Sequence, residues 1–107
     1  GFLEIVERVG LSARLGAWVV EEAIAQLAQW RGQGLDYLGM SVHLSGACLA
    51  APGCLDEIGE LLHRHALPAS AMEFEVSEAT LALDAHQVHA TLAGLRRMGA
   101  TLTVQDF

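Results

Sequence analysis

The spacing of apolar residues along the chain predicts three helices that alternate with three short strands. The first helix is expected to begin at Ser12, an N-cap residue type, and to run to about Arg31, ahead of Gly32 and Gly34. One apolar stripe should bind this helix to the core, made of Leu11, Leu15, Trp18, Val19, Ala23, Leu27 and Trp30.

Turn and capping residues bound the two later helices. Pro52 and Gly53 should turn the chain into the second helix, which should fade before Pro68 because the residue ahead of a proline avoids helical angles. The third is expected to open at Asp84 with a capping box and to end near Gly99. The apolar positions assigned to these helices are Leu55, Ile58, Leu61, Leu62, Val88, Leu92, Leu95 and Met98.

The predicted strands, at about residues 37–45, 71–77 and 101–106, alternate between apolar and polar side chains. Strands covered on both faces would instead be almost continuously apolar. Parallel strands joined by right-handed crossovers place all their helices on one side, so the polar faces should gather on the other. That polar set is Ser41, His43, Glu73, Glu75, Ser77, Thr103 and Gln105.

This order predicts an α/β fold, namely part of a (β/α)8 TIM-like barrel with about three βα units and parallel strands. Functional groups of such barrels lie at the carboxyl ends of the strands, where His43, Glu75 and Gln105 fall. Periodicity alone leaves open a sheet whose polar face is simply exposed to solvent. No linker, charge block or repeat divides residues 1–107, which are expected to form part of a single domain.

Composition narrows the functional classes. The 107 residues are 52% apolar and carry a net charge of -7, which excludes a nucleic-acid surface because phosphate backbones would be repelled. No apolar run approaches the length of a membrane span, and the first residue is not Met, so a soluble, cytoplasmic segment of a longer protein is expected. Cys48 and Cys54 are expected to be packed thiols, since their spacing to His63 and His65 matches no usual zinc pattern.

Four segments, read in order, carry a further signal: FLEIVERVGLSARLGAW from Phe2, MSVHLSGACL from Met40, MEFEVSEATL from Met72 and TLTVQDF from Thr101. Together they resemble the EAL domain family over essentially the whole chain. The first is similar to the stretch that follows the family's Glu-Ala-Leu motif. The others resemble its Asn-Leu-Ser, Glu-x-Thr-Glu and Asp-Asp-Phe strands, so the resemblance implies that roughly half of a barrel of about 250 residues is missing.

The resemblance implies cleavage of cyclic di-GMP to a linear dinucleotide with Mg²⁺ or Mn²⁺, by a water activated between two cations. Such cations prefer oxygen ligands. By position, Glu75 matches a metal-binding Glu, and Asp106 matches the second Asp, associated with the second metal. Glu78 matches the Glu that steadies the loop after the Asp pair, and Ser77 replaces the usual Thr.

Two positions depart from the family pattern. His43 stands where the family has a metal-ligating Asn, and Gln105 stands where it has the first Asp. The first exchange replaces a hard oxygen with an imidazole nitrogen that favours zinc-like metals, and the second removes a bridging carboxylate. His43, Glu75, Gln105 and Asp106 are therefore the predicted ligand-binding residues, with an impaired metal site at Glu75 and Asp106.

The sequence thus predicts a degenerate EAL domain in bacterial signalling, acting as a cyclic-di-GMP receptor or a protein-interaction module. One alternative is an active metal-dependent phosphodiesterase that yields linear pGpG, and another is a dimerisation module that binds no nucleotide. Simpler readings of single residues also stand: Glu75 as a solvated carboxylate and His43 as a hydrogen-bonded histidine. Two open sheet edges and an uncovered polar face predict protein partners, a homodimer or a covering neighbouring segment.

Overall fold

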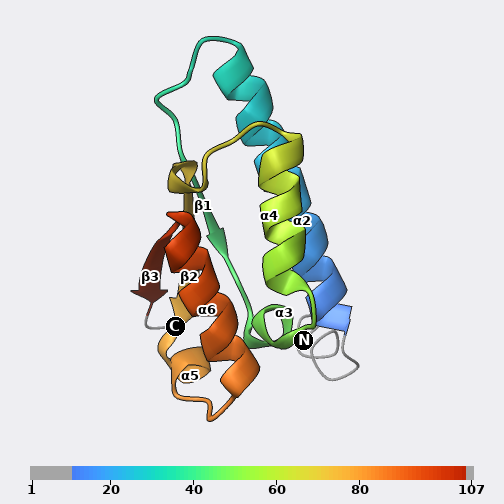
Figure 1. Ribbon diagram of the computed structural model, residues 1–107, viewed down its shortest axis with the longest axis vertical. Helices are drawn as coiled ribbons and strands as arrows, with labels where there is room; N and C mark the ends of the chain where they lie inside the picture. Colours follow the sequence, from blue (N-terminus) through green and yellow to red (C-terminus); the bar gives the residue numbers. More distant parts are fainter. Residues whose placement is uncertain (1–10, 106–107) are drawn as a thin grey trace.

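The computed structural model describes residues 11–105, with the side chains of residues 16–105. In chain order its elements are α2 (Leu11–Gly32), β1 (Met40–His43), α3 (Gly46–Ala50), α4 (Cys54–Arg64), the 3-10 turn η1 (Ala69–Ala71), β2 (Met72–Ser77), α5 (Glu78–Leu81), α6 (His86–Met98) and β3 (Thr101–Gln105) (Figure 1). The predicted alternation of three helices with three strands is confirmed. Two short helices, α3 and α5, are additional to it.

The three strands form one parallel sheet in the order β1-β2-β3. Val42 of β1 pairs with Phe74 of β2, and both are buried. In β2 the side chains alternate strictly between buried and half-buried along the strand. The apolar face of the sheet therefore carries the core, as its period-two pattern predicts.

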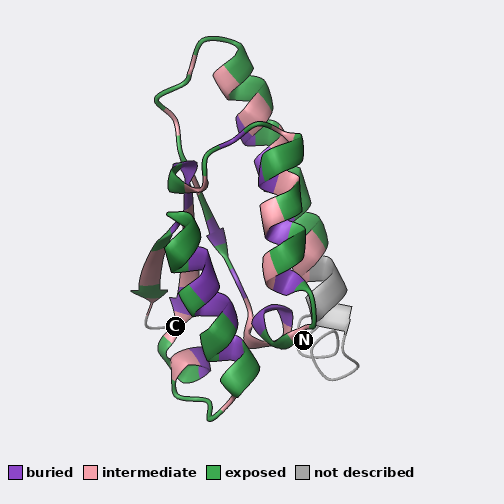
Figure 2. Ribbon diagram, in the orientation of Figure 1, coloured by how far each residue is buried: buried purple, intermediate pink, exposed green. Residues whose placement is uncertain are grey.

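Helices α2, α4 and α6 provide the cover for that apolar face. α2 contacts β1 and α4, while α6 contacts β3, α4 and α3. Figure 2 shows buried residues where these helices face one another and the strands, and exposed residues on their outer surfaces. A parallel sheet covered on one side is the arrangement that right-handed crossovers produce.

The apolar stripe predicted for α2 is wrong in its largest members. Val20, Ile24 and Leu27 are buried, whereas Trp18 is 58% exposed and Trp30 is 39% exposed. The buried three follow the spacing of a single helix face, rotated from the predicted one. α2 carries apolar residues on more than one face, and packing against β1 and α4 decides which face is buried.

Both predicted N-caps are also wrong. Ser12 lies inside α2, which is already helical at Leu11. Helix α6 has Ala85 as its N-cap and no side-chain capping bond, so Asp84 and Gln87 form no capping box. The Gln87 amide instead donates to the Thr91 hydroxyl, 3.2 Å away, because a hydroxyl one turn along the same helix is within its reach.

Short helices follow two of the strands almost directly. The Ser45 side chain accepts a hydrogen bond from the Cys48 backbone N–H at the start of α3. The Ser77 side chain accepts one from the Thr80 backbone N–H at the start of α5. Ser77 is the last residue of β2, and Ser45 lies two residues after β1. Each serine caps a short helix, which turns the chain sharply at the carboxyl end of the sheet.

The C-terminal end of α6 agrees with its prediction. Gly99 is the C-cap, with a positive φ of 110° that favours glycine. Within residues 11–105, no helix combines the length and the apolar character needed to cross a lipid bilayer.

Candidate functional site

The polar face of the sheet brings three of the predicted site residues onto adjacent strands. His43 of β1 is directly opposite Glu75 of β2, and Gln105 of β3 is directly opposite Ser77. Ser77 lies two residues beyond Glu75, so both point to the same face. His43, Glu75 and Gln105 therefore lie together at the carboxyl edge of the sheet, on the face that the core does not use.

Hydroxyl groups from the neighbouring strands hold the two carboxylates of β2. Ser41 Oγ donates to Glu75 Oε1 over 2.9 Å. Thr103 Oγ1 donates to Glu73 Oε1 over 2.7 Å. Both glutamates are half-buried, and hydrogen bonds to a carboxylate are stronger than those between neutral groups. The carboxylates are thus oriented along the sheet rather than extended into solvent.

The turns after β1 and β2 are in contact beside these residues. A Cβ placed on Gly46, the first residue of α3, would lie 3.6 Å from Thr80 Oγ1 and 3.4 Å from Leu83 Cδ1. Thr80 is buried, and its hydroxyl also lies 2.9 Å from Ser77 Oγ. Because Gly46 has no side chain, the two turns can approach each other closely. This contact fixes the carboxyl ends of β1 and β2 relative to each other.

The structure says less about two further predicted site residues, Glu78 and Asp106. Glu78 is exposed in the first turn of α5, where a carboxylate interacts favourably with the helix dipole. Asp106 lies outside the described residues, as does the start of the segment that Glu78 is predicted to steady. The metal-ligand role of Asp106 and the anchoring role of Glu78 stay predictions.

The donor groups at the described strand ends determine which cations they could help to bind. No group of three or more His, Cys, Asp or Glu side chains within residues 16–105 is arranged to hold a metal ion. At the strand ends, Glu75 supplies the carboxylate, His43 an imidazole and Gln105 an amide. Mg²⁺ and Mn²⁺ prefer oxygen ligands, mostly carboxylates and water, and of these three side chains Glu75 supplies a carboxylate.

The role of the Ser41 and Thr103 hydroxyl groups was harder to predict from the sequence than that of the glutamates. Ser41 and Thr103 belong to the predicted polar face. The register places Ser41 opposite Glu73 and Thr103 opposite Glu75, but each hydroxyl donates diagonally to the other carboxylate, which only the side-chain positions show. The helices α3 and α5 could have been found from a serine at or just after the end of each strand that precedes helix-forming residues. Such a capping serine is a weak signal, because it also fits the alternating pattern of the strand before it.

Comparison with known proteins agrees with this geometry. The family model for the EAL domain matches residues 1–107. The bifunctional diguanylate cyclase/cyclic di-GMP phosphodiesterase MucR of Pseudomonas aeruginosa is 34% identical over 106 residues, which are 99% of this chain and 16% of that protein. A cyclic di-GMP phosphodiesterase of the same organism is 31% identical over 106 residues, 99% of this chain and 18% of that protein.

Solved structures show the same likeness in three dimensions. The MucR phosphodiesterase in complex with c-di-GMP has a TM-score of 0.87 and 34% identity, over 99% of this chain and 45% of that one. The FimX EAL domain has a TM-score of 0.87 and 30% identity, over 99% of this chain and 42% of that one. The chain thus spans less than half of these structures. The predicted fold class, part of a (β/α)8 TIM-like barrel with three parallel βα units, is confirmed.

Proposed function

Because this chain belongs to the EAL domain family, we propose that it is part of a single bacterial EAL domain that binds cyclic di-GMP without hydrolysing it. One observation supports the second half of this proposal. Among the described strand residues, the carboxyl edge of the sheet presents the carboxylate of Glu75 beside the imidazole of His43, with the amide of Gln105 on the next strand. We place the domain in the cytoplasm, a reducing compartment in which the unbridged Cys48 and Cys54 are thiols unless an oxidant reaches them.

The chemistry of these side chains favours binding over cleavage. Hydrolysis by two cations needs carboxylates that neutralise them and fix an activated water between them. An amide at position 105 removes one of those negative charges. Imidazole and amide groups instead carry N–H donors, which can bind the phosphate oxygens of a cyclic dinucleotide directly. The same edge of the sheet is thus better suited to recognising the nucleotide than to activating water.

The direct test is calorimetric titration of the intact protein with cyclic di-GMP, with and without Mg²⁺ or Mn²⁺. We expect binding whose affinity is the same in both conditions, because the ligand is held by protein donors. Chromatography of the same samples should show no linear dinucleotide. Cation-dependent turnover by the natural protein would contradict the proposal.

Charge substitutions on β2 separate direct recognition from recognition through a cation. If no cation intervenes, Glu75→Gln removes a negative charge near the phosphates and should tighten binding by about fivefold, or ~1 kcal/mol. The same change at Glu73 is the matched control, since Glu73 lies on the same face nearer the amino end of β2 and is held by Thr103. Loss of binding in Glu75→Gln alone would instead indicate a bridging cation.

Restoring the family residues tests whether the altered positions matter. The double variant His43→Asn, Gln105→Asp returns an oxygen ligand and a carboxylate to the edge of the sheet. We expect its nucleotide binding to become dependent on Mn²⁺ or Mg²⁺, even if turnover does not appear. If the double variant titrates like the natural protein in all conditions, these two positions do not control the cation site.

A working phosphodiesterase is the second candidate, favoured by the 34% identity to MucR. Formation of pGpG in the titration samples would establish it. A protein that neither binds nor cleaves the nucleotide would be an interaction or dimerisation module, and its exposed Trp18 offers a first residue to test in sedimentation.

A further inference from the structure

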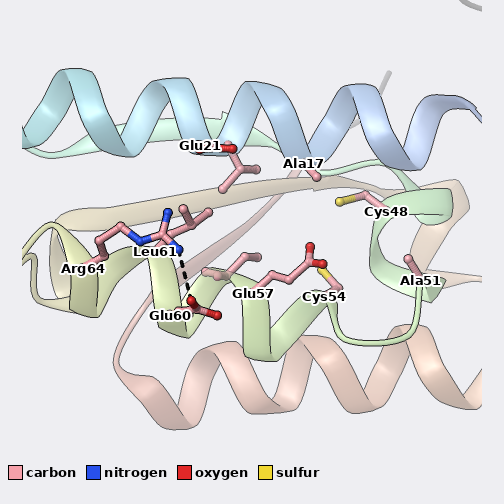
Figure 3. A pocket seen from close by; sticks show the side chains of 11 residues that line it. Ala17, Glu21, Cys48, Ala51, Cys54, Glu57, Glu60, Leu61 and Arg64 are labelled. Carbon is pink, nitrogen blue, oxygen red and sulfur yellow. Dashed lines mark hydrogen bonds and ion pairs between the residues drawn. The ribbon is translucent and has the colours of Figure 1, made fainter.

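The two cysteines of the chain face a common cavity away from the polar face of the sheet. Cys48 of α3 is 4% exposed and Cys54, at the start of α4, is 6% exposed. Both line a cavity of about 270 Å³ between α2, α3 and α4. In Figure 3 the Cys48 sulfur points into this cavity, and the Cys54 sulfur lies beside the Glu57 carboxylate.

A tight turn between α3 and α4 folds the two thiols toward the same side. The Ala51 N–H donates to the Cys48 carbonyl over 3.2 Å, and the Cys54 N–H donates to the Ala51 carbonyl over 3.3 Å. Gly53 takes a left-handed φ of 83°, which directs the chain straight into α4. Behind the pair, a Cβ on Gly16 of α2 would lie 3.4 Å from Cys48 Sγ, so α2 closes that side.

The two thiols differ in character because one donates to the other. The Cys54 thiol donates a hydrogen bond that lowers the pKa of Cys48, against the opposing effects of burial and of the Glu57 carboxylate. The pKa of Cys54 is raised by that same hydrogen bond first, then by burial and the negative charge nearby. Cys48 therefore ionises before Cys54. This difference suits Cys48 to be the attacking thiol and Cys54 to be the resolving thiol.

We propose that Cys48 and Cys54 are a redox-active dithiol that a small, uncharged hydroperoxide converts into an intramolecular disulfide. The Cys48 thiolate attacks the terminal peroxide oxygen, the O–O bond breaks, and the departing oxygen takes up a proton to leave as an alcohol or water. The Cys54 sulfur then attacks the Cys48 sulfenic acid, the S–O bond breaks, and the proton lost by Cys54 completes a molecule of water. Two thiols are oxidised by two electrons and one peroxide is reduced.

The cavity admits the oxidant that this reaction needs. Glu57 and Glu60 are exposed at its rim, and Arg64, which is also exposed, is 3.0 Å from Glu60 and offsets part of their charge. Glu21 adds a further acid from α2, so the rim is net negative. A neutral peroxide can pass such a rim, whereas an anionic disulfide such as oxidised glutathione is repelled. Metal capture is a poorer account of the thiols, because within residues 16–105 no third ligand is arranged with them.

Peptide mapping of the intact protein tests the proposal directly. Trypsin cleaves after Arg31 and Arg64 and finds no site between them, so one peptide, residues 32–64, carries both cysteines. After treatment with hydrogen peroxide we expect this peptide to be lighter by two hydrogen atoms and to take up no iodoacetamide, and dithiothreitol should reverse both changes. Two alkylated cysteines after peroxide, or a bridge to another chain, would overturn the proposal.

Single substitutions assign the two roles. Cys54→Ser keeps a hydroxyl donor but no resolving sulfur, so Cys48 should stop at a sulfenic acid that dimedone labels. Cys54→Ala also removes the donor, and labelling of Cys48 at neutral pH should slow by roughly tenfold relative to Cys54→Ser.

Cys48→Ser is the converse control, in which Cys54 should react little. Equal rates for the two cysteines in these variants would show that they are ordinary packed thiols. If a variant does not fold, as judged by circular dichroism, the peptide mass of the natural protein decides alone.

Discussion

Replacing Gly94 with alanine measures how closely α4 and α6 are packed. Gly94 is buried in the middle of α6. An added Cβ would overlap Leu55 Cδ2 and would lie 3.0 Å from Leu55 Cδ1 and 3.2 Å from Leu55 Cγ. Three atoms of one side chain are involved, so rotating a single methyl group does not remove the overlap.

Two effects of opposite sign set the size of the change. Alanine in a helix interior is more stable than glycine by about 1 kcal/mol. Inserting a methyl group into a packed interface costs about 1 to 3 kcal/mol. We therefore expect Gly94→Ala to lower the free energy of unfolding by about 1 kcal/mol, against the intrinsic preference of the helix.

A double-mutant cycle with Leu55→Ala isolates the contact. In the Leu55→Ala background the overlap is gone, so Gly94→Ala should raise the free energy of unfolding by about 1 kcal/mol. The coupling between the two positions is then about 2 kcal/mol, which urea unfolding followed by circular dichroism resolves.

Gly59 provides the matched control for this cycle. It also lies inside a helix, α4, and a Cβ there would meet Met98 Cε at an ordinary 3.7 Å. Gly59→Ala should stabilise the protein by about 0.5 to 1 kcal/mol. If Gly94→Ala stabilises the natural protein as much as Gly59→Ala does, α4 and α6 are not closely packed at Gly94.

Other substitutions probe the core and the strand ends, each by urea unfolding. Thr91→Val leaves the buried Leu49 carbonyl without the 2.9 Å hydrogen bond from Thr91 Oγ1, and should cost about 1 to 3 kcal/mol; an unchanged midpoint would mean that the carbonyl is hydrated. Ser45→Ala removes the cap that binds the Cys48 N–H and should cost about 1 kcal/mol, whereas Ser45→Asp, which keeps an acceptor, should cost less. Phe74→Ala empties a fully buried site and should cost about 3 to 5 kcal/mol, and a loss below 1 kcal/mol would contradict its place in the core.

Local periodicity determined much of the fold from the sequence alone. The alternation in β2 predicts one apolar and one polar face, and the structure shows that pattern without exception along the strand. The side-chain direction of a strand is set by its own backbone, so no distant contact is needed to establish it. For the same reason the sequence placed His43, Glu75 and Gln105 on one face, at one edge of a parallel sheet.

Tertiary structure decided what depends on partners far along the chain. Which apolar face of α2 is buried follows from its contacts with β1 and α4, and those bury Ile24 while leaving Trp18 exposed. The same holds for the Ser41 hydrogen bond to Glu75, which joins residues 34 positions apart. Cys48 and Cys54 line one cavity because of the turn between α3 and α4, in which Gly53 has a left-handed φ. The local backbone sets which side chains share a face of a helix or strand. Long-range packing then decides which of the apolar faces is buried.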